Sequence, residues 1–191
     1  MRPRGLETGF ELDRRWHWLR GEMEQSKKPS LLLLAEILAE SGVPYAVIGG
    51  VALQVHTEEP RTTLDIDLAV TDLGALPRES FRRAGFAERG RFAHSENWAA
   101  PDDTPVQFTD DPALAPAVLR AGSVELESVR LKVIGVADLL REKLRAGTDP
   151  ARRRSKRLQD LADAQALLEQ RPELANALTS EERAILAKLP A

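Results

Sequence analysis

Two aspartates that stand one residue apart, Asp65 and Asp67, have the clearest potential for chemistry in this sequence. They alternate with Leu64, Ile66 and Leu68, which is the period-two pattern of a strand with one apolar face. Both carboxylates therefore project from the other face, about 7 Å apart along the strand. Carboxylates this close repel each other unless a hard divalent cation such as Mg²⁺ or Mn²⁺ neutralises them. The pattern predicts a metal site that receives substrate phosphates, and solvated carboxylates on an edge strand are the alternative.

A double glycine, Gly49 and Gly50, precedes these carboxylates. Residues 45–48 form a short apolar run typical of a strand, and residues 51–56 can begin a helix at once. Glycines let the backbone turn sharply and approach a ligand, and a helix N-terminus offers free N–H groups and the positive end of a dipole. Strand, tight turn and helix together predict a phosphate-binding turn, whereas a double glycine alone indicates only a turn.

Joined at this spacing, with Arg61 and Thr63 just before the carboxylates, the two motifs resemble the signature of the DNA polymerase β-like nucleotidyltransferase superfamily. That signature is a GG or GS turn followed by aspartates that alternate with apolar residues. The sequence is most similar to the AbiEii/AbiGii toxin-like branch over roughly residues 31–170. The later segments that also match are Lys143-Leu144-Arg145-Ala146 and Asp160-Leu161-Ala162-Asp163.

The resemblance implies an enzyme that uses Mg²⁺ or Mn²⁺ to transfer a nucleoside monophosphate from an NTP to an acceptor. In toxin-like relatives the acceptor looks like RNA, in particular tRNA, or a protein hydroxyl, and such a toxin would have a cognate antitoxin as its partner. The residue roles that the resemblance implies are the metal for Asp65 and Asp67, the nucleotide phosphates for Gly49, Gly50, Arg61 and Thr63, and the triphosphate for Lys143.

Lys143 also stands out without the resemblance. It lies near the centre of the apolar stripe of a helix predicted after Gly135, a stripe formed by Val136, Leu139, Leu140 and Leu144. A buried ammonium is costly unless it is paired, so we expect Lys143 to point toward a carboxylate or a phosphate. The alternative is a lysine that extends past the stripe to water.

A helix predicted over about residues 156–170 carries two further candidates, Asp160 and Asp163. Its expected buried side is formed by Leu158, Leu161, Ala164 and Leu168. Asp160 lies at the edge of that stripe, so we expect it to be the active-site carboxylate, as a base or as the partner of Lys143. Asp163 falls on the opposite side and is expected to be a solvated or capping residue, although the resemblance alone allows either.

Two positions depart from the superfamily pattern. One is Val51, since many relatives have a hydroxyl residue in the glycine turn to hold a phosphate oxygen. A strand predicted over residues 106–109 carries Gln107 where nucleotidyltransferases usually place a third carboxylate. Glutamine forms hydrogen bonds but neither acts as a general base nor brings charge to a metal. Either Asp110 or Asp111 takes that part, or the site works with two aspartates and a different base. Gln107 also supports a second hypothesis, a catalytically silent module that binds a nucleotide or a partner.

A basic run, residues 152–157, contains five cations in six residues. Such a run is usually a solvated linker or loop, but near a phosphate-binding site it would also hold an RNA backbone. It contains no aromatic residue, so base stacking has no support there. A third, weaker hypothesis is a nucleotidyltransferase that acts on a small molecule of the aminoglycoside type, which would fit an acidic substrate groove better than this run.

The composition is ordinary for a soluble domain, with 191 residues, 42% hydrophobic and 30% charged. No apolar run reaches the length of about 18 residues that a membrane span needs. The sequence has no cysteine and its start has no apolar signal-peptide region, which predicts a cytoplasmic protein. The net charge of −3 argues against an extensive nucleic-acid surface and allows a local basic patch.

The alternation of predicted helices and strands indicates an α/β (α+β) fold, with a small mixed sheet flanked by helices. We expect an N-terminal helical extension over residues 1–28, a nucleotidyltransferase core over 29–134, and a helical region over 135–191 that completes the active site. A helix over about residues 10–25 is expected to pack through Trp16, Trp18 and Leu19, with ligand stacking by the rings as the alternative. Ser30 is expected to cap the next helix, 31–40. His94, Asn97 and Trp98 are expected in a polar loop, and residues 123–133 in a hairpin.

Overall fold

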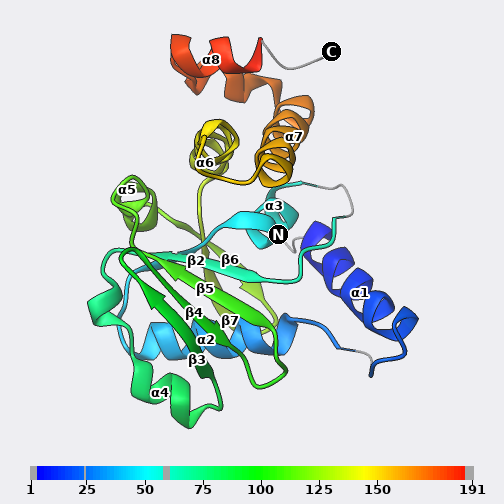
Figure 1. Ribbon diagram of the computed structural model, residues 1–191, viewed down its shortest axis with the longest axis vertical. Helices are drawn as coiled ribbons and strands as arrows, with labels where there is room; N and C mark the ends of the chain where they lie inside the picture. Colours follow the sequence, from blue (N-terminus) through cyan, green and yellow to red (C-terminus); the bar gives the residue numbers. More distant parts are fainter. Residues whose placement is uncertain (1–3, 24, 58–60, 188–191) are drawn as a thin grey trace. The chain divides into compact units, whose positions relative to one another are not determined.

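The computed structural model describes residues 4–23, 25–57 and 61–187. The chain divides into two compact units, residues 1–134 and residues 135–191 (Figure 1). The expected mixed α/β fold is confirmed, since seven strands form one mixed sheet with helices around it. Within the described ranges, no helix is both long enough and apolar enough to cross a membrane.

The first unit is built on the seven-stranded sheet, whose strands follow the order β3-β4-β5-β2-β1-β7-β6. The pairs β2 with β5 and β1 with β7 are parallel, and the other neighbours are antiparallel. The strands that carry the predicted motifs, β1, β2 and β5, therefore lie next to one another in the middle. The strands are β1 Tyr45–Val47, β2 Ile66–Val70, β3 Ala87–Phe92, β4 Ser95–Ala99, β5 Pro105–Thr109, β6 Gly122–Leu126 and β7 Val129–Val133.

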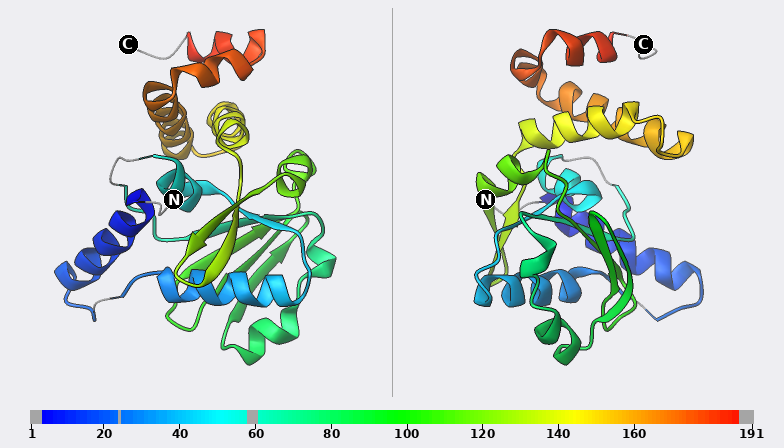
Figure 2. Two further views of the ribbon diagram at one scale, coloured as in Figure 1. Left: turned by 180° about the vertical axis from the view of Figure 1, so that it is seen from behind. Right: turned by 60° about the vertical axis from the view of Figure 1, so that its left-hand side comes forward.

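Helices cover the apolar side of this sheet. Helix α2 lies across one face (Figure 2). Helix α4 adds Phe81, whose ring stacks on Phe108 with centroids 5.4 Å apart and meets Trp98 edge-on at 5.4 Å. This aromatic cluster fixes β4 and β5 from one side and leaves their other side for polar residues. The helices of this unit are α1 Arg4–Leu19, α2 Lys28–Glu40, α3 Gly49–His56, the short 3₁₀ helix η1 Leu73–Ala75, α4 Arg78–Arg83 and α5 Ala115–Leu119.

Two predictions for β4 and α2 were wrong. The expected polar loop around Trp98 is strand β4, in which the Trp98 side chain is 2% exposed, because antiparallel pairing with β3 and β5 orders it. Ser30 does not cap α2, which begins at Lys28 with Pro29 in its first turn. The Ser30 hydroxyl instead donates to Asp102 Oδ1 at 2.8 Å, a contact between residues far apart in the sequence. The hairpin predicted over residues 123–133 is present as β6 and β7.

Helix α1 begins earlier than predicted and packs against α3 through two glycines. A Cβ atom on Gly5 would lie 2.2 Å from the Thr57 carbonyl oxygen, and one on Gly9 would lie 2.3 Å from Gln54 Nε2. The buried stripe of α1 ends at Asp13. Trp16, Trp18 and Leu19 lie beyond it with 45%, 65% and 73% of their surfaces exposed, so the prediction that they pack into the core was wrong.

A buried ion pair joins α1 to the start of α2. Asp13 and Lys27 form a close contact, and their side chains are 3% and 2% exposed. Burial raises the pKa of the Asp13 carboxyl and lowers the pKa of the Lys27 ammonium, and in each case the partner's charge opposes the shift. The Asp65 carboxylate also favours the charged form of Lys27, so this pair lies within electrostatic reach of a predicted metal ligand. Both shifts mean that removing these charges from water costs free energy.

The second unit consists of helices. Helices α6 and α7 pack tightly at Gly147, where a Cβ atom would lie 2.6 Å from Leu161 Cδ2. Helix α8 begins with a capping box, in which the Thr179 hydroxyl accepts from the Glu182 amide and the Glu182 carboxylate accepts from the Thr179 amide. The predicted end of this last helix, residues 188 and 189, lies outside the described residues. The elements are α6 Val136–Thr148, α7 Arg154–Gln170, the 3₁₀ helix η2 Pro172–Ala177 and α8 Ser180–Leu186.

The buried pair in the first unit yields a stability prediction. Lys27→Met is expected to lower the free energy of unfolding by about 3–5 kcal/mol at neutral pH, because it leaves the Asp13 carboxylate buried without a counter-charge. The combined change Asp13→Leu with Lys27→Met should leave stability unchanged or raised, since no charge is then buried. Urea denaturation measures both effects.

The pH dependence of the single variant follows from the raised pKa of Asp13. A carboxyl whose pKa is higher in the folded state favours folding when it is protonated. The stability of the Lys27→Met protein should therefore recover as the pH falls through that folded-state pKa. A combined variant as unstable as the single one, at every pH, would contradict the prediction.

Candidate active site

The double glycine lies directly against one of the predicted metal ligands. Gly49, the first residue of α3, has a left-handed backbone with φ of +61°. A Cβ atom on Gly49 would lie 2.2 Å from Asp67 Oδ2, which is far inside van der Waals contact. Both the conformation and the space therefore require glycine here. The turn between β1 and α3 and the Asp67 carboxylate form one local structure.

The second glycine is linked to the other aspartate through a threonine. A Cβ atom on Gly50 would lie 2.5 Å from Thr63 Oγ1. The Thr63 hydroxyl donates a hydrogen bond of 2.6 Å to Asp65 Oδ1, which orients that carboxylate. Thus Gly49, Gly50, Thr63, Asp65 and Asp67, which the sequence predicted as site residues, are gathered at the end of β1 and the start of β2.

Arg61 belongs to the segment that leads into this site. Its backbone carbonyl accepts a hydrogen bond of 2.6 Å from Gln54 Nε2, and Gln54 is a fully buried residue of α3. Helix α3 therefore positions the chain just ahead of Asp65 as well as beginning with the glycine turn. A phosphate-binding role for the Arg61 guanidinium stays a prediction.

A row of polar side chains extends from Asp67 across the sheet. In the strand register Asp67 of β2 pairs with Gln107 of β5, and Gln107 pairs with Asn97 of β4. Paired residues on neighbouring strands lie on the same face, about 5 Å apart. Gln107 is exposed and Asn97 is half-buried, whereas Trp98 and Phe108 of the same strands face the core. Sequence analysis predicted Gln107 but missed Asn97, which lay in the supposed loop.

The aspartates after β5 do not lie in this row. Asp110 follows Gln107 by three residues, which corresponds to about 10 Å along a strand. Its carboxylate lies 3.1 Å from His94 Nδ1. Asp111 is further along, where its amide donates to Thr109 Oγ1 at 3.2 Å. The position opposite Asp67 is therefore occupied by the neutral Gln107, and a role for Asp110 stays a prediction.

The residues present fit a Mg²⁺ ion that is held in part by the protein and in part by substrate. Among the described residues there is no group of three or more His, Cys, Asp or Glu side chains arranged to hold a metal. Asp65 and Asp67 provide carboxylate oxygens only, which suits Mg²⁺, an ion that usually keeps several waters and binds substrate phosphates. Because Gly49 has no side chain, the Asp67 carboxylate packs directly against the turn that begins α3, a helix start whose backbone N–H groups suit a phosphate.

The second unit contains a buried cluster of its own. Lys143 of α6 is 7% exposed, and its Nζ lies 2.8 Å from Asp160 Oδ1 and 2.7 Å from Asp163 Oδ2. Arg152 approaches the other oxygen of Asp160, with its Nε 2.8 Å from Oδ2. The prediction that Lys143 points to a carboxylate instead of water is confirmed, and Asp160 is its partner as expected.

Asp163 was predicted to be solvated, which was wrong. It is 4% exposed and shares Lys143 with Asp160. The buried face of α7 is formed by Asp160, Asp163, Ala164 and Leu167, while Leu158 is 57% exposed. Two carboxylates are tolerated on that face because cations neutralise them. A hydrophobic pattern within one helix does not contain that information, since the neutralising lysine lies on another helix.

Comparison with known proteins identifies the fold. No protein-family model and no curated protein matches the chain. Among solved structures, an antigenic nucleotidyltransferase-like protein from Paracoccidioides brasiliensis aligns with a TM-score of 0.57 at 22% identity, over 84% of this chain and 85% of the other. The antibiotic-resistance factor ANT(2″)-Ia, in complex with adenylyl-2″-tobramycin, aligns with a TM-score of 0.53 at 13% identity, over 84% of this chain and 94% of the other. Its solution structure gives a TM-score of 0.51 at 14% identity, over 84% and 91%.

At these identities the comparison establishes the nucleotidyltransferase fold alone. It agrees with the superfamily that the sequence motifs resemble. Membership of the toxin-like branch, and the role of each site residue, stay predictions.

The contact between Gly49 and Asp67 generates a prediction with a matched control. Gly42 also has a left-handed backbone, with φ of +66°, but a Cβ atom there would meet nothing within 4 Å. Gly42→Ala should therefore cost only the backbone strain of about 1–2 kcal/mol. Gly49→Ala should cost clearly more in urea denaturation, and it alone should weaken Mn²⁺ binding, because its methyl group displaces the Asp67 carboxylate. Equal effects of the two substitutions would contradict this account of the site.

Proposed function

We propose that this protein is a Mg²⁺- or Mn²⁺-dependent nucleotidyltransferase, which transfers a nucleoside monophosphate from an NTP to an acceptor and releases pyrophosphate. The observation that carries the proposal is the contact of the glycine turn with Asp67, together with the Thr63 bond to Asp65. A turn suited to phosphate and two carboxylates suited to a divalent cation are thereby part of one site. The nucleotidyltransferase fold of the chain supports the same function.

The reaction would proceed by displacement at the α-phosphorus of the NTP. An acceptor oxygen forms a bond to that phosphorus, the bond from it to the α–β bridging oxygen breaks, pyrophosphate leaves, and the acceptor proton passes to a base. Asp65 and Asp67 would hold Mg²⁺, which when bound neutralises phosphate charge in the transition state. The N–H groups at Gly49 and Gly50 would bind phosphate oxygens, and catalysis would rest on positioning and electrostatic stabilisation.

The remaining predicted residues receive narrower roles. Arg61 is proposed to balance phosphate charge. The triphosphate role that the resemblance gives Lys143 stays a prediction, because its ammonium is already shared by Asp160 and Asp163. Asp160 accepts from Lys143 on one oxygen and from Arg152 on the other, and protonation of this carboxylate would displace one of those bonds. We therefore assign Asp160 an ordering role in preference to that of a general base. Gln107, in register with Asp67, is proposed to hydrogen-bond the acceptor.

For the acceptor we propose RNA, in particular tRNA, or a protein hydroxyl, and we propose that the protein acts as a toxin with a cognate antitoxin. The support is the resemblance of the Lys143 and Asp160 segments to the toxin-like branch. A small acceptor is the competing possibility, because the neighbour ANT(2″)-Ia was captured with an adenylylated aminoglycoside. A catalytically silent nucleotide-binding module is the competing function, and the neutral Gln107 opposite Asp67 favours it.

The test is transfer of ³²P from each α-labelled NTP in the presence of Mg²⁺, with total tRNA, the protein itself and tobramycin offered as acceptors. The native protein should transfer label to tRNA or protein, and Asp65→Asn with Asp67→Asn should abolish transfer without loss of folding. A chelator should abolish it as well, because the two carboxylates would then lack their cation.

The outcomes separate the hypotheses. Transfer of label to tobramycin but not to RNA or protein would show that the acceptor is a small molecule. NTP binding without transfer to any acceptor would contradict the enzymatic proposal. If Gln107→Asp then produced activity that the native protein lacks, the glutamine would be the cause of a silent site.

A further inference from the structure

The end of helix α1 presents an unusual exposed surface. Residues 14–20 read Arg-Arg-Trp-His-Trp-Leu-Arg, a segment we refer to as the basic-aromatic segment. Trp16 is 45% exposed, Trp18 65% and Leu19 73%, and Met23 just beyond is 79% exposed. Large exposed apolar side chains this close together along one segment make it a candidate binding surface.

These exposed apolar side chains do not belong to the buried face of α1. The residues of α1 that are buried are Gly5, Leu6, Gly9, Phe10 and Asp13. The helix continues for six residues past Asp13, about 9 Å at the usual helical rise, with little of the molecule beneath it (Figure 1). The segment therefore projects from the first unit with its rings in solvent.

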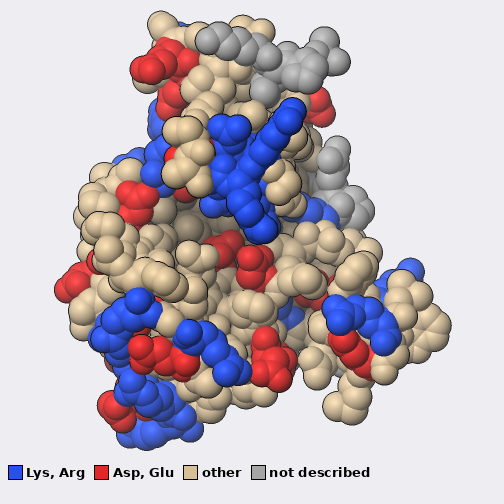
Figure 3. Space-filling model, in the orientation of Figure 1, with Lys and Arg blue, Asp and Glu red and all other residues tan. Residues whose placement is uncertain are grey.

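Its charge is opposite to that of the chain as a whole. The segment contains three arginines and no acidic residue, whereas the protein carries a net charge of −3. Arg14 pairs with Glu11 at 2.7 Å and Arg20 with Glu22 at 3.1 Å. Arg15 forms no ion pair with any described residue. In Figure 3 the region at the right of the view, where α1 lies, shows blue Lys and Arg atoms next to red Asp and Glu atoms and uncharged ones.

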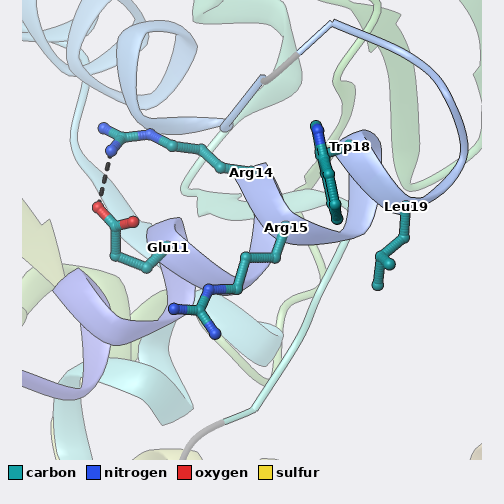
Figure 4. A pocket seen from close by; sticks show the side chains of 5 residues that line it. All are labelled: Glu11, Arg14, Arg15, Trp18 and Leu19. Atoms are coloured by element: carbon teal, nitrogen blue, oxygen red, sulfur yellow. Dashed lines mark hydrogen bonds and ion pairs between the residues drawn. The ribbon is translucent and has the colours of Figure 1, made fainter.

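A shallow hollow lies on one side of the segment. It is lined by Glu11, Arg14, Arg15, Trp18 and Leu19. Figure 4 shows Arg14 turned toward Glu11, Arg15 extended without an ion pair, and the Trp18 ring standing beside Leu19. One ligand in this hollow can therefore contact both the indole ring of Trp18 and the unpaired guanidinium of Arg15.

We propose that the basic-aromatic segment binds single-stranded RNA, with a base stacked on Trp18 and phosphates held by Arg15 and Arg14. Exposed aromatic rings next to arginines are the means by which proteins hold single strands without reading sequence. The proposal deepens the proposed function, because it rests on an RNA acceptor and names where such a strand is held.

The arrangement favours a nucleic-acid strand over a partner helix. At 100° per residue, Trp16 and Trp18 point about 200° apart around α1, so they do not form one apolar stripe. A helix that docks on another protein needs such a stripe. Here cations alternate with rings around the helix, which suits a polyanion with exposed bases.

The experiment measures RNA binding in an inactive protein. The Asp65→Asn, Asp67→Asn protein, full length, is titrated into a fluorescein-labelled single-stranded RNA of about 12 nucleotides, a length typical of single-strand sites, and into the duplex of the same sequence. Trp18→Ala should weaken binding to the single strand at least about fivefold, and Trp18→Phe much less, because phenylalanine retains a stacking face. Arg15→Ala should reduce the slope of log K against log salt concentration by about 0.7.

A matched control comes from elsewhere in the first unit. Phe92 of β3 is 62% exposed, so Phe92→Ala removes an exposed ring outside the segment and should leave RNA binding unchanged. Thermal melting of each variant checks that it folds. Duplex binding should not respond to Trp18→Ala, because paired bases are already stacked.

The proposal is overturned if Trp18→Ala and Arg15→Ala leave single-strand binding unchanged, or if Phe92→Ala weakens it equally. It is also overturned if the segment instead mediates self-association, seen as a molecular mass that falls on Trp18→Ala while RNA binding stays the same. Because binding is measured without catalysis, a failure of nucleotidyl transfer with intact RNA binding would refute the proposed function alone.

Discussion

The close approach of Gly49 to the Asp67 carboxylate is the constraint on which the rest of the site depends. It follows from the register of β1 and β2, which pairs Val47 with Leu68 and lets the Ile48 amide donate to the Asp67 carbonyl at 2.9 Å. With the strands fixed in this way, the turn after β1 has to pass beside Asp67, and only a glycine in the left-handed conformation fits. The same turn starts α3, whose Gln54 holds the segment before Asp65.

Charges elsewhere in the described structure are buried in neutralised groups. Lys27 lies with Asp13, Lys143 lies with Asp160 and Asp163, and Glu96 forms ion pairs with Arg78 and Arg91. In each of these groups the opposite charges neutralise one another. They add little to the stability of the fold, because the cost of removing the charges from water offsets their attraction. The row of Asp67, Gln107 and Asn97 differs, because it brings a carboxylate and two amides together on the more open face of the sheet. That contrast makes the row the natural place for a ligand.

The motifs around the site were predictable from sequence because they depend on local rules. Period-two alternation predicted Asp67 on the polar side of β2, and a double glycine after an apolar run predicted the turn. The predicted strand began too early, since Asp65 lies just before β2 and Leu64, expected on the apolar face, is 51% exposed. The errors arose where distant contacts decide the structure. Trp98 lies in a strand because that strand pairs with β3 and β5. Asp163 is buried because a lysine on another helix neutralises it. Trp16 and Trp18 are exposed because the packed part of α1 ends at Asp13. The residues that decide these features lie far away in the sequence, so a local sequence pattern does not reveal them.

A crystal structure with Mn²⁺ and a non-hydrolysable NTP analogue, in which anomalous scattering locates the metal, would show where the nucleotide and its metal bind. We expect a metal peak bound by Asp65 and Asp67, with phosphate oxygens at the amides of the Gly49-Gly50 turn. A nucleotide bound elsewhere, or a metal that contacts neither aspartate, would contradict the central claim that turn and carboxylates form one nucleotide site.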